Sequence, residues 1–123
     1  MKTSLSALHH QAIDWQRELA FYTEELSILN NRLKTTLAAG YDAGITKQFN
    51  DFEKEFASLT TQIEGLKKDV AVREGVIENM TEETMGGDDT INTTEDVILK
   101  QMKDLAHEIA DARFFFNLFL AKL

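Results

Sequence analysis

The spacing of the large apolar residues restricts the fold of this chain more than any other feature. In residues 8–33, 45–80 and 98–123, apolar side chains recur at intervals that alternate mainly between four and three residues. This alternation is typical of α-helices that pack side by side along a heptad seam. We therefore predict an all-α fold, an antiparallel up-down-up three-helix bundle of long, heptad-patterned helices.

Each predicted helix contributes one seam to the expected core. The first seam is Leu8, Ala12, Trp15, Leu19, Tyr22, Leu26, Leu29 and Leu33. The second is Ile45, Phe49, Phe52, Phe56, Leu59, Ile63, Leu66, Val70, Ile77 and Met80, interrupted only by Arg73. The third is Ile98, Met102, Leu105, Ile109, Ala112, Phe116, Phe119 and Leu123. For Arg73 we expect the aliphatic stem to pack while the guanidinium reaches Glu74, Asp69 or an acid of the first helix.

Two short segments separate the seams. "AAGYDAG" carries Gly40 and Gly44, which we interpret as the stop and restart signals between the first two helices. "MGGDDTINTT" breaks the pattern again, and Thr93 with Asp96 resembles a capping box that opens the third helix. The 123 residues, none of them proline, are expected to form one helical-bundle domain, residues 1–123.

The predicted helices differ in length, which leaves part of the core without cover. They measure about 50, 60 and 43 Å, so the third is too short to follow the first two to their common turn. The uncovered tip, with Leu33, Phe49 and Phe52, is then a candidate groove for a partner helix. A linker of about ten residues would allow the third helix to slide toward this tip, which would expose the other end instead.

A second set of apolar residues falls outside the seams. Phe21 and Ile28 lie one heptad apart on the first helix, and Phe114 and Leu118 lie nearly opposite the third seam, with Phe115 beside it. If the third helix starts level with the end of the second, Phe114 lies near the height of Ala20. The two groups would then form a patch of several hundred Å², which soluble monomers seldom leave exposed.

A homodimer is the simplest partner for such a patch, because a twofold axis buries the patch against itself. The alternative is a monomer whose third helix has a broad apolar face, which accounts for Phe115 and Leu120 more easily than for Phe114 and Leu118. Insertion into a membrane interface would require a basic face, which this chain lacks.

Charge and targeting signals narrow the partners further. The net charge of −8 disfavours nucleic acid and anionic lipid, since both are bound by lysine and arginine. The sequence has no cysteine, no secretory signal at its start and no apolar run of the roughly 18 residues that a membrane span needs. We expect a cytoplasmic protein for which another protein is a candidate partner and which binds neither nucleic acid nor a membrane.

Histidine–carboxylate clusters are the only candidate metal ligands. They are His10, Asp14 and Glu18 on the first helix, and Asp104, His107 and Asp111 on the third. The second cluster weakly resembles the Glu-x-x-His motif of di-iron bundles, in which the ligands point inward from four helices. Here the heptad frame places both histidines outside, so we expect no metal site, no cofactor and no catalytic residues. A metal-binding bundle remains the alternative function.

Parts of the sequence also resemble a known family. "HHQAIDWQRELAFYTEELSILNNRL", "FNDFEKEFASLTTQIEGLKKDV" and the closing "FNLFLAKL" are similar to an uncharacterised family of small all-helical Bacteroidetes proteins. The resemblance implies a cytosolic helical bundle and supplies no activity or cofactor. The three long helices, with a tryptophan early in the first, also resemble a spectrin repeat in shape. We expect a non-enzymatic protein that acts through self-association and protein–protein interaction.

Overall fold

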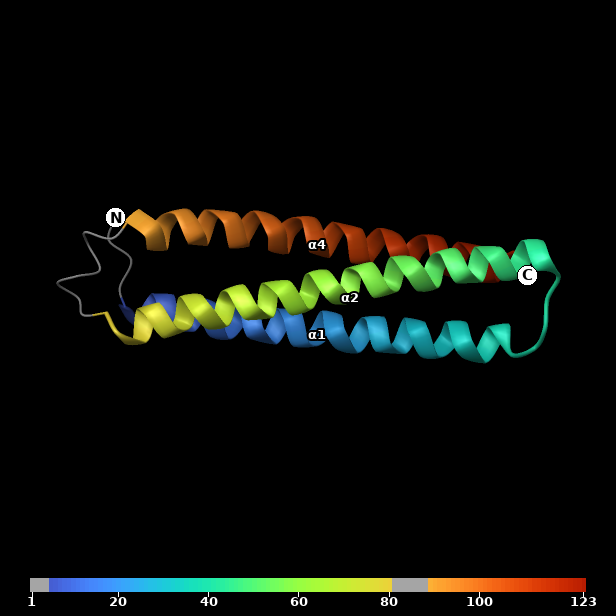
Figure 1. Ribbon diagram of the computed structural model, residues 1–123, viewed down its shortest axis with the longest axis horizontal. Helices are drawn as coiled ribbons and strands as arrows, with labels where there is room; N and C mark the ends of the chain where they lie inside the picture. Colours follow the sequence, from blue (N-terminus) through green and yellow to red (C-terminus); the bar gives the residue numbers. More distant parts are fainter. Residues whose placement is uncertain (1–4, 81–88) are drawn as a thin grey trace.

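The protein is an all-α bundle of three long helices. The structure is a computed structural model that describes residues 5–80 and 89–123, with side chains in the second range from residue 93. Helix α1 spans Leu5–Leu37, α2 spans Ala43–Glu78 and α4 spans Asp89–Ala121. The helices run up, down and up along one rod, so that α1 and α4 are parallel and α2 is antiparallel to both (Figure 1). This is the predicted fold class.

The predicted seams form the core of the bundle. Most of their members are buried, among them Leu19, Leu33, Phe56 and Val70 with no measurable exposure, while Ile45 and Met80 are partly buried. Tyr22, Phe52 and Phe119 are half-buried and pack against this core. Leu123 is the exception, because it lies beyond the end of α4 and is exposed. The heptad spacing therefore identified the faces along which the helices meet.

The connection between α1 and α2 follows its sequence signals. Gly40 adopts a φ of 84°, in the left-handed region that favours glycine, and its N–H donates to the carbonyl of Leu37 at 3.0 Å. Asp42 then caps α2, since its side chain accepts a hydrogen bond from the N–H of Ile45 at 2.9 Å. Gly44 lies within the first turn of α2.

The third helix starts earlier than predicted. It begins at Asp89, so that Thr93 lies inside the helix and the expected capping box does not mark its start. With 33 residues, α4 is as long as α1, and its C-terminal end reaches the beginning of α2 (Figure 1). The predicted difference in length is therefore wrong, and so is the uncovered tip that followed from it.

Aromatic side chains of α4 fill the tip instead. The ring of Phe119 lies 4.9 Å from that of Phe49 and 5.3 Å from that of Phe52, between centroids. Phe116 contacts Phe52 at 5.2 Å and Phe56 at 5.3 Å. Leu33 and Phe49 are fully buried and Phe52 is half-buried. The proposed partner groove at Leu33, Phe49 and Phe52 is thus occupied by the protein's own C-terminal helix.

Polar contacts between α1 and α4 define their relative height. Gln11 donates to Glu95 at 2.9 Å, Arg113 pairs with Glu25, and Arg32 donates to Asn117 at 3.0 Å. Phe114 lies between Arg113 and Asn117 in sequence, and therefore level with Ile28. The predicted height of Phe114 near Ala20 was wrong by about two helical turns, because α4 extends toward the tip.

Candidate functional site

The five side chains expected at an interface are all exposed. The exposed fractions are 61% for Phe114, 59% for Phe21, 58% for Ile28, 55% for Phe115 and 43% for Leu118. The Phe114 and Phe115 rings contact each other edge to face, with centroids 5.3 Å apart. Large apolar residues with this exposure on two neighbouring helices make the surface of α1 and α4 a candidate for contact with another molecule.

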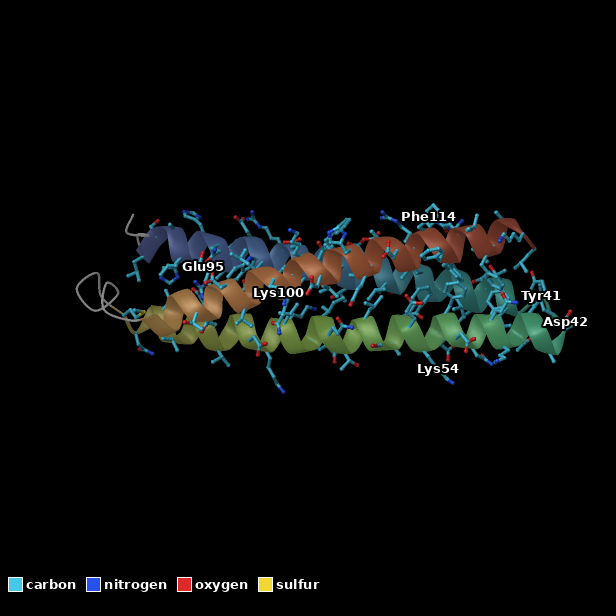
Figure 2. All side chains as sticks on the ribbon, turned by 90° about the horizontal axis from the view of Figure 1, so that it is seen from above. Tyr41, Asp42, Lys54, Glu95, Lys100 and Phe114 are labelled. Atoms are coloured by element: carbon cyan, nitrogen blue, oxygen red, sulfur yellow. The ribbon has the colours of Figure 1, made fainter. Side chains whose placement is uncertain are left out.

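The three of these residues that belong to α4 point in different directions around that helix. Each residue turns a helix by about 100°, so Phe114 lies about 160° from the buried Phe116, on the side of Arg113 and Asn117 that meets α1. Figure 2 accordingly shows Phe114 projecting away from α2. Phe115 is turned about 100° from Phe114, toward α2, and its ring remains in contact with that of Phe114. Leu118 lies one turn beyond Phe114, on the part of α4 between the side toward α1 and the side toward α2.

Phe21 and Ile28 belong with Phe114. They precede Glu25 and Arg32 by four residues each, which places them about 40° from these two contacts to α4. The ion pair of Glu25 with Arg113 and the hydrogen bond of Arg32 with Asn117 therefore run between the apolar residues of the two helices. We call this surface the α1–α4 face; it consists of Phe21, Ile28, Phe114 and Leu118.

The predicted histidine–carboxylate clusters do not gather into metal sites. In the part of the chain that the structure describes, no group of three His, Cys, Asp or Glu side chains could hold a metal ion. Glu18 is engaged elsewhere, because it accepts a hydrogen bond from the Tyr22 hydroxyl at 2.5 Å. Burial and this hydrogen bond raise the pKa of Tyr22 above its ordinary value. His10 and His107 are both exposed.

Arg73 is buried in the core, with only 2% of its surface exposed. Its guanidinium lies 4.9 Å from the centre of the Trp15 ring, and its Nη2 donates to Gln11 Oε1 at 3.1 Å. The guanidinium of Arg73 therefore contacts the Trp15 ring and the Gln11 amide instead of the acidic side chains that were expected. Nε and Nη1 of Arg73 have no hydrogen-bond partner among the described residues. Burial lowers the pKa of Arg73, while the charges of Glu95 and Glu74 oppose this shift.

The surroundings of Arg73 connect all three helices. His9 Nδ1 on α1 lies 2.6 Å from Glu74 Oε1 on α2, and Gln11 links Arg73 to Glu95 on α4. The seam spacing predicted the packing of the Arg73 stem, but gave no signal for the contacts of His9, Gln11 or Glu95. Their roles depend on the relative height of the helices, which the pattern leaves open.

A groove follows the line where α2 and α4 meet, and no pattern in the sequence predicted it. Its first section is a hollow of about 420 Å³ with Val72, Val76 and Val97 in its walls. Two further hollows, of about 280 and 310 Å³, continue along the same two helices. Asp69 lines the first and second hollows, and Gln62 and Glu108 line the second and third. The three hollows are thus sections of one α2–α4 groove.

The chemistry of the α2–α4 groove changes along its length. The valine end is apolar, with Val72 68% and Val97 50% exposed. The middle is acidic, and its carboxylates are Glu55, Asp69, Asp104, Glu108 and Asp111. Beyond Asp111, one turn further along α4, the exposed ring of Phe115 lies on the same side of the helix.

Gly65 forms part of the wall in the acidic section. A Cβ atom added there would meet no other atom within 4 Å, so the absence of a side chain leaves this section open. None of the five groove carboxylates forms an ion pair with a described residue; the two ion pairs involve Glu25 and Glu74. The groove therefore presents negative charge that no neighbouring cation of the described chain offsets by direct contact.

The α1–α4 face and the α2–α4 groove are the features of this chain from which a function can be inferred. Within the described residues, no helix combines the length and the apolar character needed to cross a membrane. No protein-family model matches the chain, and neither a curated protein nor a solved structure shows significant similarity to it.

Proposed function

We propose that this is a non-enzymatic, cytoplasmic protein that acts through self-association and contact with other proteins. The observation that carries the proposal is the exposure of Phe21, Ile28 and Phe114, all on the α1–α4 face. A second copy placed on this face by a twofold axis would cover all three, with Leu118 and Phe115 at the margin.

The amount of apolar surface favours a weak homodimer over a permanent one. An aromatic side chain has about 150–250 Å² to bury, and roughly half of each of these remains exposed. The five residues then offer roughly 500 Å² per protomer, below the roughly 800 Å² per partner of a standard stable interface. The pairs Arg113–Glu25 and Arg32–Asn117 would lie inside the contact and orient it.

Sedimentation velocity tests the homodimer directly. Wild type should reach a monomer–dimer equilibrium at micromolar concentration, and the double variant Ile28→Gln, Phe114→Gln should sediment as a helical monomer. The control is His107→Gln with Asp111→Asn, which changes exposed residues of α4 one heptad before Phe114 and Leu118. This control should still dimerise. A wild-type protein that stays monomeric throughout the micromolar range would rule out the proposed function.

A further inference from the structure

We propose that the α2–α4 groove binds a cationic amphipathic helix of a partner protein, laid along the groove as a fourth helix. The three hollows of this surface are lined by none of Phe21, Ile28, Phe114 and Leu118, and the two surfaces meet only at the C-terminal end of α4, where Phe115 contacts Phe114. The proposal does not require self-association. The occupant is inferred from two properties of the groove, the order of its apolar and acidic sections and the open space at Gly65.

The order of the sections defines the pattern of the partner. An apolar anchor would enter the hollow at Val72, Val76 and Val97, and a second would contact Phe115 and Leu118 at the other end. Val97 and Phe115 lie 18 residues apart on α4, or about 27 Å along the axis. A helix of about 20 residues with apolar side chains near both ends matches this distance.

The charge of the middle section selects lysine or arginine between these anchors. Five carboxylates line it, and the chain as a whole carries a net charge of −8. A cationic helix would gain from this field at a distance and from ion pairs on contact. A second copy of this acidic chain would place carboxylates against carboxylates here, so it fits the groove poorly.

Gly65 provides room for the partner backbone. A large side chain at this position would project into the groove, whereas the existing backbone accepts a Cβ atom without contact. Gly75 is a matched position, because it is also in α2, also has no atom within 4 Å of an added Cβ, and does not line any of the three hollows. Both substitutions should leave α2 intact, since leucine favours helix over glycine.

Fluorescence anisotropy with three labelled synthetic helices of about 20 residues tests the proposal. The first probe has leucine anchors at both ends and lysines between them. The second has glutamates in place of the lysines, and the third keeps the lysines but has serine anchors. Wild type should bind the first probe at least about tenfold more tightly than either of the others, and raising the salt from about 0.05 to about 0.5 M should weaken this binding.

The variants locate the binding site. Gly65→Leu should weaken binding of the first probe about tenfold or more, whereas Gly75→Leu should stay within about twofold of wild type. Asp104→Asn with Glu108→Gln should weaken binding and reduce its salt dependence. Equal binding by Gly65→Leu and Gly75→Leu, or no preference for the first probe, would overturn the proposal.

The same samples separate this proposal from the homodimer. The monomeric variant Ile28→Gln, Phe114→Gln should still bind the first probe, because both changes lie outside the groove. If Gly65→Leu abolished self-association in sedimentation while leaving probe binding unchanged, the groove would belong to a second copy and the cationic helix would be wrong.

Discussion

At the scale of single residues, Arg73 shows what can be predicted from the sequence and what cannot. Its place in the second seam predicted that its aliphatic stem packs in the core, because every seventh residue of a packed helix returns to the same face, but not that its guanidinium is buried as well. Its partners could not be predicted, since Gln11 and Trp15 come within reach only at one relative height of α1 and α2. The heptad repeat determines which face of a helix is buried, but it does not determine the position of the helix along the axis of the bundle.

Replacement of Arg73 by methionine should raise the free energy of unfolding by about 1 kcal/mol. The reason is that burial lowers the pKa of Arg73, which means that the folded state disfavours its charged form. Methionine fills a similar volume and leaves no unpaired nitrogen, and Glu74 keeps its contact with His9. Urea denaturation at neutral pH measures the change.

Arg113→Met is the control for this substitution. Arg113 is half exposed and its ion pair with Glu25 lies on the surface, so the change should stay within about 0.5 kcal/mol. If Arg73→Met instead lowered the free energy of unfolding by more than about 1 kcal/mol, the contacts of the cation with Trp15 and Gln11 would outweigh its desolvation.

At the scale of helices, the misplaced start of α4 accounts for the largest error in the sequence prediction. Thr93 and Asp96 match a capping box, but the helix continues through them to Asp89. Local cap preferences contribute only about 1 kcal/mol, and the burial of two aromatic rings contributes more. Packing of Phe116 and Phe119 against the phenylalanines of α2 thus sets the position of α4, and this long-range contact is invisible in a helical repeat.

The neighbouring residues Phe115 and Phe116 test this account of α4. Phe116 is fully buried, so Phe116→Ala should lower the free energy of unfolding by about 3–5 kcal/mol. Phe115 is 55% exposed and points toward the groove, so Phe115→Ala should cost less than about 1 kcal/mol. Chemical denaturation of both variants gives the comparison, and similar losses for the two would contradict the described rotation of α4.

At the scale of the whole molecule, the sequence predicted the bundle and the exposed apolar residues better than their arrangement. Phe21, Ile28, Phe114, Phe115 and Leu118 are exposed as the heptad frame indicated, but polar contacts run between those of α1 and α4, and Phe115 is turned toward α2. The α2–α4 groove could not be predicted, because its three hollows combine residues of two helices whose relative height was misjudged.

Self-association would make the thermal stability of the molecule depend on its concentration. If the folded dimer is populated and the unfolded chain is monomeric, the Tm of wild type should rise as the protein concentration rises from low micromolar to submillimolar. The variant Ile28→Gln, Phe114→Gln should show the same Tm at every concentration. Differential scanning calorimetry measures both, and a wild-type Tm that does not change with concentration would argue against the homodimer.

The parallel course of α1 and α4 has a consequence for anything joined to this protein. The start of α1 and the end of α4 lie at opposite ends of the rod (Figure 1). With 33 residues in α1, the distance between them is about 50 Å. Because the packed bundle is rigid, two proteins fused directly to these ends would be joined at points that stay this far apart for as long as the three helices remain packed.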